Sequence, residues 1–153
     1  MKTLQLLFAV ILLAGLSGCA SSQNATVSPG ADLGAVKSYY VLHLPKDDRG
    51  INKLICDDLN GRGCKASTGE AGSAPPDAQA VVTYQDKWMW DMTMYMLKLD
   101  LQIRDPKTDV ALASGEVMHT SLVRKSPPEM VKEVIDQIFQ KAASSKAAPM
   151  GSQ

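Results

Sequence analysis

The sequence predicts an α+β domain of the two-layer sandwich type, in which a four-stranded, mainly antiparallel sheet carries two helices on one face. One segment, 95–104, alternates apolar and polar side chains, which is typical of a strand with one buried face. Another, 126–142, combines a helix-capping motif with an apolar stripe at helical spacing. The expected elements follow one another as strand, helix, three strands and helix (β-α-β-β-β-α), all within residues 37–142.

The first half of this domain is expected to supply one strand, one helix and a long loop. Aromatic and branched residues concentrate in 37–44, and Pro45 ends that strand. The helix that follows can be capped by Asp47 or Asp48. Its apolar residues recur at helical spacing: Ile51, Leu54, Ile55 and Leu59. Residues 64–78 are rich in glycine, serine, alanine and proline, which predicts a long mobile loop.

The second half is expected to supply three strands and the second helix. The strands are predicted at 80–85, 95–104 and 111–122, and the last two pair as a hairpin through the turn-forming residues between them. Ser126 and Glu129 form a capping box at the start of the helix. The apolar stripe of this helix consists of Val131, Val134, Ile135, Ile138 and Ala142, whereas Lys132, Glu133, Asp136 and Gln140 are expected to face water.

Residues 1–18 have the layout of a cleaved export signal. Lys2 provides a positive charge, residues 4–13 are apolar except for Gln5, and small residues follow. The apolar stretch is shorter than the ~20 residues that a membrane-spanning helix needs. An uncleaved membrane helix is the alternative interpretation.

The four residues Leu16-Ser17-Gly18-Cys19 resemble the lipobox of bacterial lipoproteins. The resemblance implies that a lipid is attached to the Cys19 thiol, that the peptide is cut before Cys19, and that the new amino group is acylated. Lipoproteins kept in the inner membrane usually carry Asp after the lipid-bearing cysteine, whereas Ala20 and Ser21 follow here. The resemblance therefore implies attachment to the outer membrane, on its periplasmic face.

Two segments are predicted to lie outside the folded domain. Residues 19–36 begin with the lipid-bearing cysteine and continue with small polar residues, which predicts a flexible tether. Residues 143–153 are rich in alanine, serine and lysine and are expected to be disordered. The chain between them is long enough for one hydrophobic core.

The charge balance argues against nucleic acid as a partner. The chain has 16 basic and 16 acidic residues, and removal of Lys2 with the signal leaves 15 against 16, a net charge of −1. Binding to nucleic acid depends on an excess of positive charge facing the phosphates. The membrane, through the lipid, and an envelope protein are the expected partners.

Two cysteines remain if Cys19 carries a lipid. Cys56 and Cys64 are predicted to form a disulfide, because the periplasm is oxidising. Closing so short a loop would stabilise the fold by roughly 2.5 kcal/mol in the chain-entropy model. A metal site is the weaker alternative, because no paired histidine accompanies the two cysteines. A reduced, structural pair is the other alternative.

Residues 88–96 form the most unusual segment, with both tryptophans and four of the eight methionines. In one continuous strand, alternate positions would form an apolar patch opposite the helices, which predicts docking of a protein, an apolar ligand or the bilayer. The patch would consist of Trp88, Trp90, Met92, Met94 and Met96. Alternatively, a bulge or hairpin around 87–91 resets the alternation and sends the tryptophans into the core, or the loop 64–78 covers them.

The run from Tyr84 to Met92 also resembles a segment of small proteobacterial lipoproteins of unassigned function. That resemblance covers the second half of the domain and implies no activity.

The sequence carries no catalytic signature. His43 and His119 lie on expected strands without ligand spacing, and no nucleophile elbow or phosphate loop occurs. Asp86 and Asp91 would have to converge with His119 to form a catalytic cluster, and we interpret all three as polar surface groups. We therefore expect no catalytic residue, no metal and no cofactor.

These observations predict a lipid-anchored, non-enzymatic interaction module of the periplasm. A binder of a lipid or another apolar envelope component is the second hypothesis, and it requires a hydrophobic cavity between the helices and the sheet. An uncharacterised hydrolase is the third, and it requires a cleft that holds His119 and a carboxylate.

Overall fold

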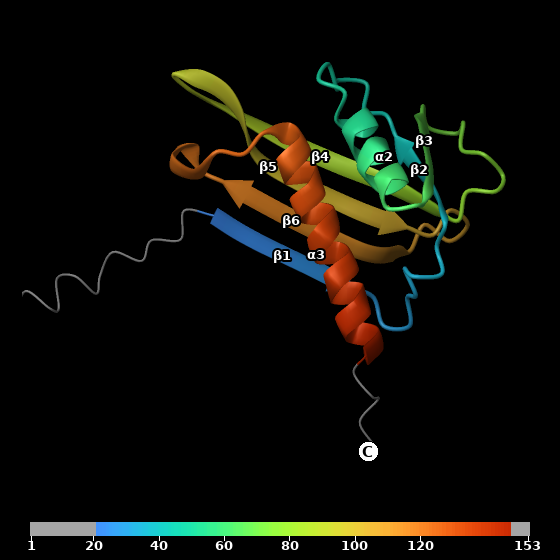
Figure 1. The fold of residues 1–153 in the computed structure, drawn as a ribbon. Coiled ribbons are helices and arrows are strands. Elements are labelled where there is room, and N and C mark those ends of the chain that lie inside the picture. Colours follow the sequence, from blue (N-terminus) through green and yellow to red (C-terminus); the bar gives the residue numbers. More distant parts are fainter. Residues whose placement is uncertain (1–20, 148–153) are drawn as a thin grey trace, which may run out of the picture.

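The computed structural model describes residues 21–147, which form one sheet with two helices packed on one of its faces (Figure 1). The strands are β1 (Ser21–Val27), β2 (Ser38–Leu42), β3 (Lys65–Gly69), β4 (Ala80–Asp91), β5 (Thr93–Arg104) and β6 (Ala111–His119). The helices are α2 (Ile51–Gly61) and α3 (Pro127–Ala147), and a short 3₁₀ turn, η1 (Ser121–Val123), precedes α3. The predicted α+β class is confirmed, but the sheet has six strands rather than four.

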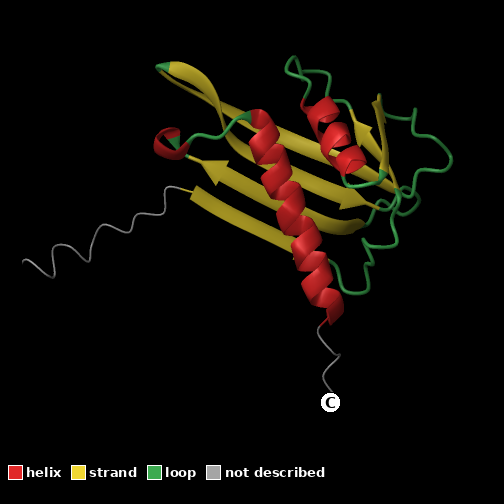
Figure 2. Ribbon diagram, viewed as in Figure 1, coloured by secondary structure: helices red, strands yellow, loops and turns green. Residues whose placement is uncertain are grey.

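The strands are arranged in the order β1-β6-β5-β4-β2-β3. The first four are antiparallel neighbours, whereas β2 runs parallel to both β3 and β4. The parallel pairing of β2 with β3 requires a crossover, and α2 provides it by packing on that side of the sheet (Figure 2). Helix α3 lies across β1, β6 and β5 and also contacts α2.

Residues 21–27 form an edge strand and not the predicted tether. Every residue from Ser21 to Val27 pairs with β6, from Ser21 opposite His119 to Val27 opposite Ala113. Ala25 and Val27 pack against the core, and the hydroxyl groups of Thr26 and Ser114 lie 2.7 Å apart. An edge strand draws its hydrogen bonds from its neighbour, so small polar residues suffice there and give no strand signal of their own.

Other boundaries also differ from the prediction, and β4 continues to Asp91 rather than ending at residue 85. Residues 65–69, expected within a mobile loop, form β3 because their backbone pairs in parallel with β2. Helix α3 continues to Ala147, beyond the expected start of a disordered tail at residue 143. Residues 148–153, the signal 1–18 and Cys19 lie outside the described residues. Among residues 21–147, no helix combines the length and the apolar character needed to cross a bilayer.

Helix α3 begins and packs as its sequence predicts. The Glu129 carboxylate accepts hydrogen bonds from the backbone N–H and the hydroxyl of Ser126, at 2.8 and 2.6 Å, which is the part of the predicted capping box that Glu129 supplies. The predicted stripe is buried except for Ala142, which is partly buried, and Val134 and Ile138 lie fully inside the core. These two side chains lie directly over Gly115 of β6, where an added Cβ would come within 2.8 Å of each. The absence of a side chain at Gly115 therefore sets how closely α3 approaches the sheet.

Cys56 and Cys64 are both free thiols, so the predicted disulfide is absent. Helix α2 packs against β2, β3 and α3, so the arc that it buries is wider than the apolar stripe suggests. Cys56 falls within that arc and joins the hydrophobic core. Its burial, with a smaller contribution from Asp57, raises the pKa of the Cys56 thiol to about 11. The pair therefore corresponds to the reduced, structural alternative.

Candidate functional site

Strands β4 and β5 form a long hairpin that extends beyond the rest of the sheet and reaches its turn at Met92 (Figure 1). Toward the turn of the hairpin, Lys98 is the last β5 residue that pairs with β6. From Lys98 to Met92 the hairpin continues for roughly 20 Å at ~3.3 Å per residue. Trp90 stands opposite Met94 across the hairpin. Trp90 is 69% exposed and Met92 is 86% exposed. The tip thus presents large apolar side chains to the surroundings.

The predicted patch is only partly exposed, because the hairpin is irregular where it leaves the sheet. Lys87 pairs with Lys98 but Trp88 pairs with Met96, so Leu97 is an extra residue that resets the alternation. Met96 is consequently buried, contrary to its predicted place in the patch. Trp88 packs partly against the core, under the guanidinium of Arg49 at 4.1 Å from the ring centre. The alternative of a bulge or hairpin around 87–91, which would send both tryptophans into the core, is therefore only partly right, because Trp88 is half-buried but Trp90 is exposed.

The turn η1 adds two apolar residues that the sequence did not single out. Leu122 is 89% exposed and Val123 is 41% exposed. The next residue, Arg124, binds the hairpin: its guanidinium donates to the backbone oxygen of Asp91 and to the hydroxyl of Thr93, both at 2.7 Å. It also stacks 4.5 Å over the Tyr95 ring. This one arginine holds η1 beside the hairpin.

We call this surface the apolar end; it consists of Met89, Trp90, Met92, Met94, Leu122 and Val123. Seven large apolar side chains are exposed in the described part of the chain, and six of them belong to the apolar end. The seventh, Val110, lies after the turn between β5 and β6. Scattered exposed apolar residues need no explanation, but a cluster of this kind is typical of a contact surface.

Strand β1 starts at the same end of the molecule. Ser21 pairs with His119, the last residue of β6, and η1 begins two residues after His119. Figure 1 shows the start of β1, η1 and the hairpin tip along one side of the molecule, whereas α3 ends on the other side. The first described residue of the chain, Ser21, therefore lies on the same side of the molecule as the apolar end.

Met92 has a left-handed backbone conformation, with φ of 61°, which is uncommon for any residue but glycine, asparagine or aspartate. We predict that Met92→Gly raises the free energy of unfolding by up to about 1 kcal/mol. The left-handed conformation costs a residue other than glycine ~1–2 kcal/mol, and glycine relieves that strain. This gain exceeds the additional conformational entropy that glycine loses on folding, which costs ~0.5–1 kcal/mol. Denaturant unfolding of the purified domain measures the difference.

Met94→Gly is the matched control for this prediction. Met94 lies in β5 without a positive φ, so glycine relieves no strain there and lowers stability. If Met92→Gly also destabilises the protein, the exposed methionine contributes packing, and the apolar end is not a free surface.

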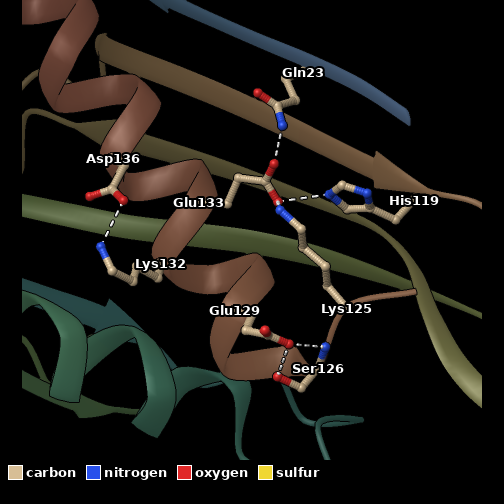
Figure 3. A network of polar contacts seen from close by, with 8 residues as sticks. All are labelled: Gln23, His119, Lys125, Ser126, Glu129, Lys132, Glu133 and Asp136. Atoms are coloured by element: carbon tan, nitrogen blue, oxygen red, sulfur yellow. Dashed lines mark hydrogen bonds and ion pairs between the residues drawn. The ribbon is translucent and has the colours of Figure 1, made fainter. Parts of the chain in front are cut away.

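A second cluster of interest is polar and joins α3 to β6 and β1 (Figure 3). The carboxylate of Glu133 lies 2.7 Å from Nε2 of His119 and 2.9 Å from Nζ of Lys125, and it accepts a hydrogen bond from the Gln23 amide. The Glu133 side chain is 12% exposed, so it does not face water as predicted. Its burial alone would raise the pKa of Glu133, but the hydrogen bonds from Lys125 and His119 outweigh that effect and lower it.

His119 occupies a buried, structural position in this cluster. It is only 3% exposed, which is the opposite of the surface position expected for it. Its Nδ1 is buried without a hydrogen-bond partner among the described residues. Its Nε2 lies within hydrogen-bond distance of the Glu133 carboxylate, which closes off that side of the ring. Both ring nitrogens are thus out of reach of a substrate, although the ring sits beside a carboxylate.

We predict that Glu133→Gln lowers the free energy of unfolding by about 1–3 kcal/mol at neutral pH, the usual range for a buried hydrogen bond to a charged group. The lowered pKa of Glu133 means that its contribution is present above the unfolded-state pKa and is lost as the pH falls through the folded-state value. The variant should therefore lose less stability than the wild type between pH 7 and pH 3.5, as measured by urea unfolding.

Glu116→Gln is the control, because Glu116 pairs with Lys98 on the exposed face of the sheet. An exposed ion pair contributes about 0–1 kcal/mol. Equal losses from the two substitutions would show that the Glu133 cluster is not a buried linkage between α3 and the sheet.

The other polar residues singled out in the sequence do not converge. Asp86 accepts a hydrogen bond from the Trp88 indole, and Asp91 pairs with Arg124 at the hairpin turn. His43 lies near the far end of β2, where its Nδ1 is 2.9 Å from the Glu70 carboxylate. Within residues 21–147, no three histidine, cysteine or acidic side chains are grouped so that they could hold a metal ion.

Two of the surface hollows that adjoin these elements have polar linings. A hollow of about 380 Å³ beside α3 is lined mainly by charged and amide side chains, including Glu133 but not His119. Another, of about 480 Å³, lies over β4 and β5 and is lined by Leu44, Thr83, Tyr84, Gln85, Lys98, Asp100 and Gln102. Neither has the apolar lining that an acyl chain requires.

No protein-family model matches the chain, and no curated protein matches it in sequence. The fold is similar to that of PelC from Paraburkholderia phytofirmans, seen as a dodecamer in two crystal forms. The TM-scores are 0.58 and 0.57 at 11% and 12% identity, over 76% and 80% of this chain and 96% of the PelC chain. At this identity the likeness shows the fold alone.

Two other solved structures are similar over most of their length, with lower TM-scores. A DUF4136 family protein from Bacteroides thetaiotaomicron has a TM-score of 0.44 at 7% identity, covering 84% of this chain and 97% of that one. A minor lipoprotein from Acinetobacter baumannii has a TM-score of 0.36 at 14% identity, covering 72% of this chain and 94% of that one. These TM-scores are too low to carry an argument about function.

Proposed function

We propose that this protein is a lipid-anchored, non-enzymatic interaction module of the bacterial cell envelope, attached through Cys19 to the periplasmic face of the outer membrane. The lipobox resemblance of Leu16-Ser17-Gly18-Cys19 supports the anchor, and Ala20 and Ser21 in place of Asp support the outer membrane. The module works by contact, through the apolar end.

The single observation that carries the proposal is the gathering of exposed apolar side chains at one end. Six of the seven that are exposed in the described residues lie there, four on a hairpin that extends away from the core and two on η1. Burial of a large apolar side chain contributes about 1.5–3 kcal/mol, so this surface favours a contact that removes it from water. The two hollows beside α3 and over β4 and β5 have polar linings, so a cavity there that encloses an apolar ligand is the less supported alternative.

In-cell photo-crosslinking tests this proposal. A benzophenone amino acid replaces Met92 in the apolar end or Gln102 on the exposed polar face of β5. We expect crosslinked products from position 92 and few from position 102. Equal yields from both positions, or products from position 102 alone, would contradict the apolar end as the contact surface.

A further inference from the structure

We propose that the apolar end inserts into the interfacial region of the same bilayer that holds the lipid on Cys19. This inference rests on the proposed function, because it takes the anchor at Cys19 as given, and it names the bilayer as what the apolar end contacts. Insertion would place the hairpin tip and η1 at the depth of the headgroups and upper acyl chains.

The position of the chain before β1 carries this inference. Ser21 is fixed by its pairing with His119, and Cys19 precedes it by two residues. Two residues span at most ~7 Å, so a lipid on Cys19 enters the bilayer close to the end of β6. Leu122 lies three residues after His119, and Arg124 ties that segment to the hairpin. The anchor and the apolar end are therefore on one side of the molecule, and a bilayer at the anchor meets the tip.

The short span between Cys19 and the fold strengthens the argument. A flexible tether over residues 19–36 would let the domain move away from the membrane. Because β1 begins at Ser21, most of that segment is instead part of the sheet or of the connection to β2. The domain is held against the surface, so its apolar end faces lipid rather than water.

The side chains at the tip suit the membrane interface. Tryptophan is enriched at the level of the headgroups, where its ring meets both apolar and polar surroundings. Met92 and Leu122 can reach deeper, because both are nearly fully exposed. The one carboxylate at the turn, on Asp91, lies 3.3 Å from the Arg124 guanidinium, so it does not enter unpaired. Arg49 stacks on Trp88 further back along the hairpin, where a cation meets the headgroups.

Tryptophan fluorescence in vesicles tests the inference with the lipidated full-length protein. Trp88→Phe leaves Trp90 as the only tryptophan, and Trp90→Phe leaves Trp88 as the matched control. Each variant is reconstituted in phosphatidylethanolamine–phosphatidylglycerol vesicles that contain lipids brominated in the upper acyl chain. We expect the bromines to quench Trp90 at least about twofold more strongly than the half-buried Trp88.

The outcomes separate the inference from the proposed function. Acylated protein that floats with the vesicles while Trp90 stays unquenched would overturn insertion and leave the anchor intact. A change in Trp90 emission that depends on the protein-to-lipid ratio, without quenching by bromine, would indicate that the apolar end contacts a second copy of the protein. That result would also overturn insertion. Protein that carries no acyl group and does not bind the vesicles would contradict the proposed function itself.

Discussion

Replacement of Cys19 by Ala is expected to move the protein from the membrane fraction to the soluble fraction, with at least a ~tenfold change in the ratio between them. The lipobox resemblance makes this thiol the attachment point of the lipid. Each buried CH₂ of an acyl chain contributes ~0.8 kcal/mol, so several chains give a durable anchor, whereas the apolar end alone gives only weak binding. Fractionation of cells that express each variant, followed by immunoblotting, measures the ratio.

Cys64→Ala is the matched control for this experiment. Cys64 is a free, partly buried thiol in the described structure, and its loss removes no lipid. We expect that variant to stay with the membranes. Release of both variants to the same extent would show that attachment depends on the folded state rather than on Cys19, and an unchanged distribution of Cys19→Ala would contradict the anchor.

The second large effect is expected at Gly115, where α3 meets the sheet. Gly115→Ala should lower the free energy of unfolding by about 1–3 kcal/mol, because overpacking a filled core forces the neighbouring side chains or backbone to move. The added Cβ would lie 2.8 Å from both Val134 and Ile138, closer than carbon atoms can approach. The shift would also disturb the Glu133–His119 contact on the same helix.

Gly61→Ala is the control for Gly115→Ala. Gly61 is the last residue of α2, and an added Cβ there has no neighbour within 4 Å. Alanine at that position gains up to about 1 kcal/mol in helix propensity and meets no obstacle. Thermal unfolding followed by circular dichroism compares the two variants. A Gly115→Ala protein as stable as the wild type would mean that α3 does not pack as closely on β6 as described.

The sequence predicted those elements whose signal is local. Strand β5 alternates because one of its faces is buried, and α3 carries both its capping box and its apolar stripe, so each could be located within a few residues. Strands β1 and β3 form because neighbouring strands offer them hydrogen bonds, a tertiary effect that their small polar residues do not reveal.

The sequence predicted only part of the candidate site, because the rest of the site depends on tertiary contacts. The concentration of tryptophan and methionine in 88–96 singled out this segment, and the structure exposes Trp90, Met92 and Met94, but on a hairpin rather than on the one continuous strand that was predicted. Whether Met96 is buried or exposed depends on the extra residue Leu97, and the alternation of a strand sequence does not by itself reveal the position of such a residue. Leu122 belongs to the apolar end because Arg124 binds the hairpin. The hairpin residues that Arg124 binds are more than 25 positions away in the chain. The proximity of β1 to that surface required the register of the whole sheet.

The mass of the mature N-terminal peptide tests the central claim most directly. Protein extracted from membranes with detergent is digested, and the N-terminal peptide is analysed by mass spectrometry. Our account predicts a peptide that begins at Cys19 and carries acyl groups on the thiol and the amino group. A peptide that retains residues 1–18, or that begins at an unmodified Cys19, would contradict it.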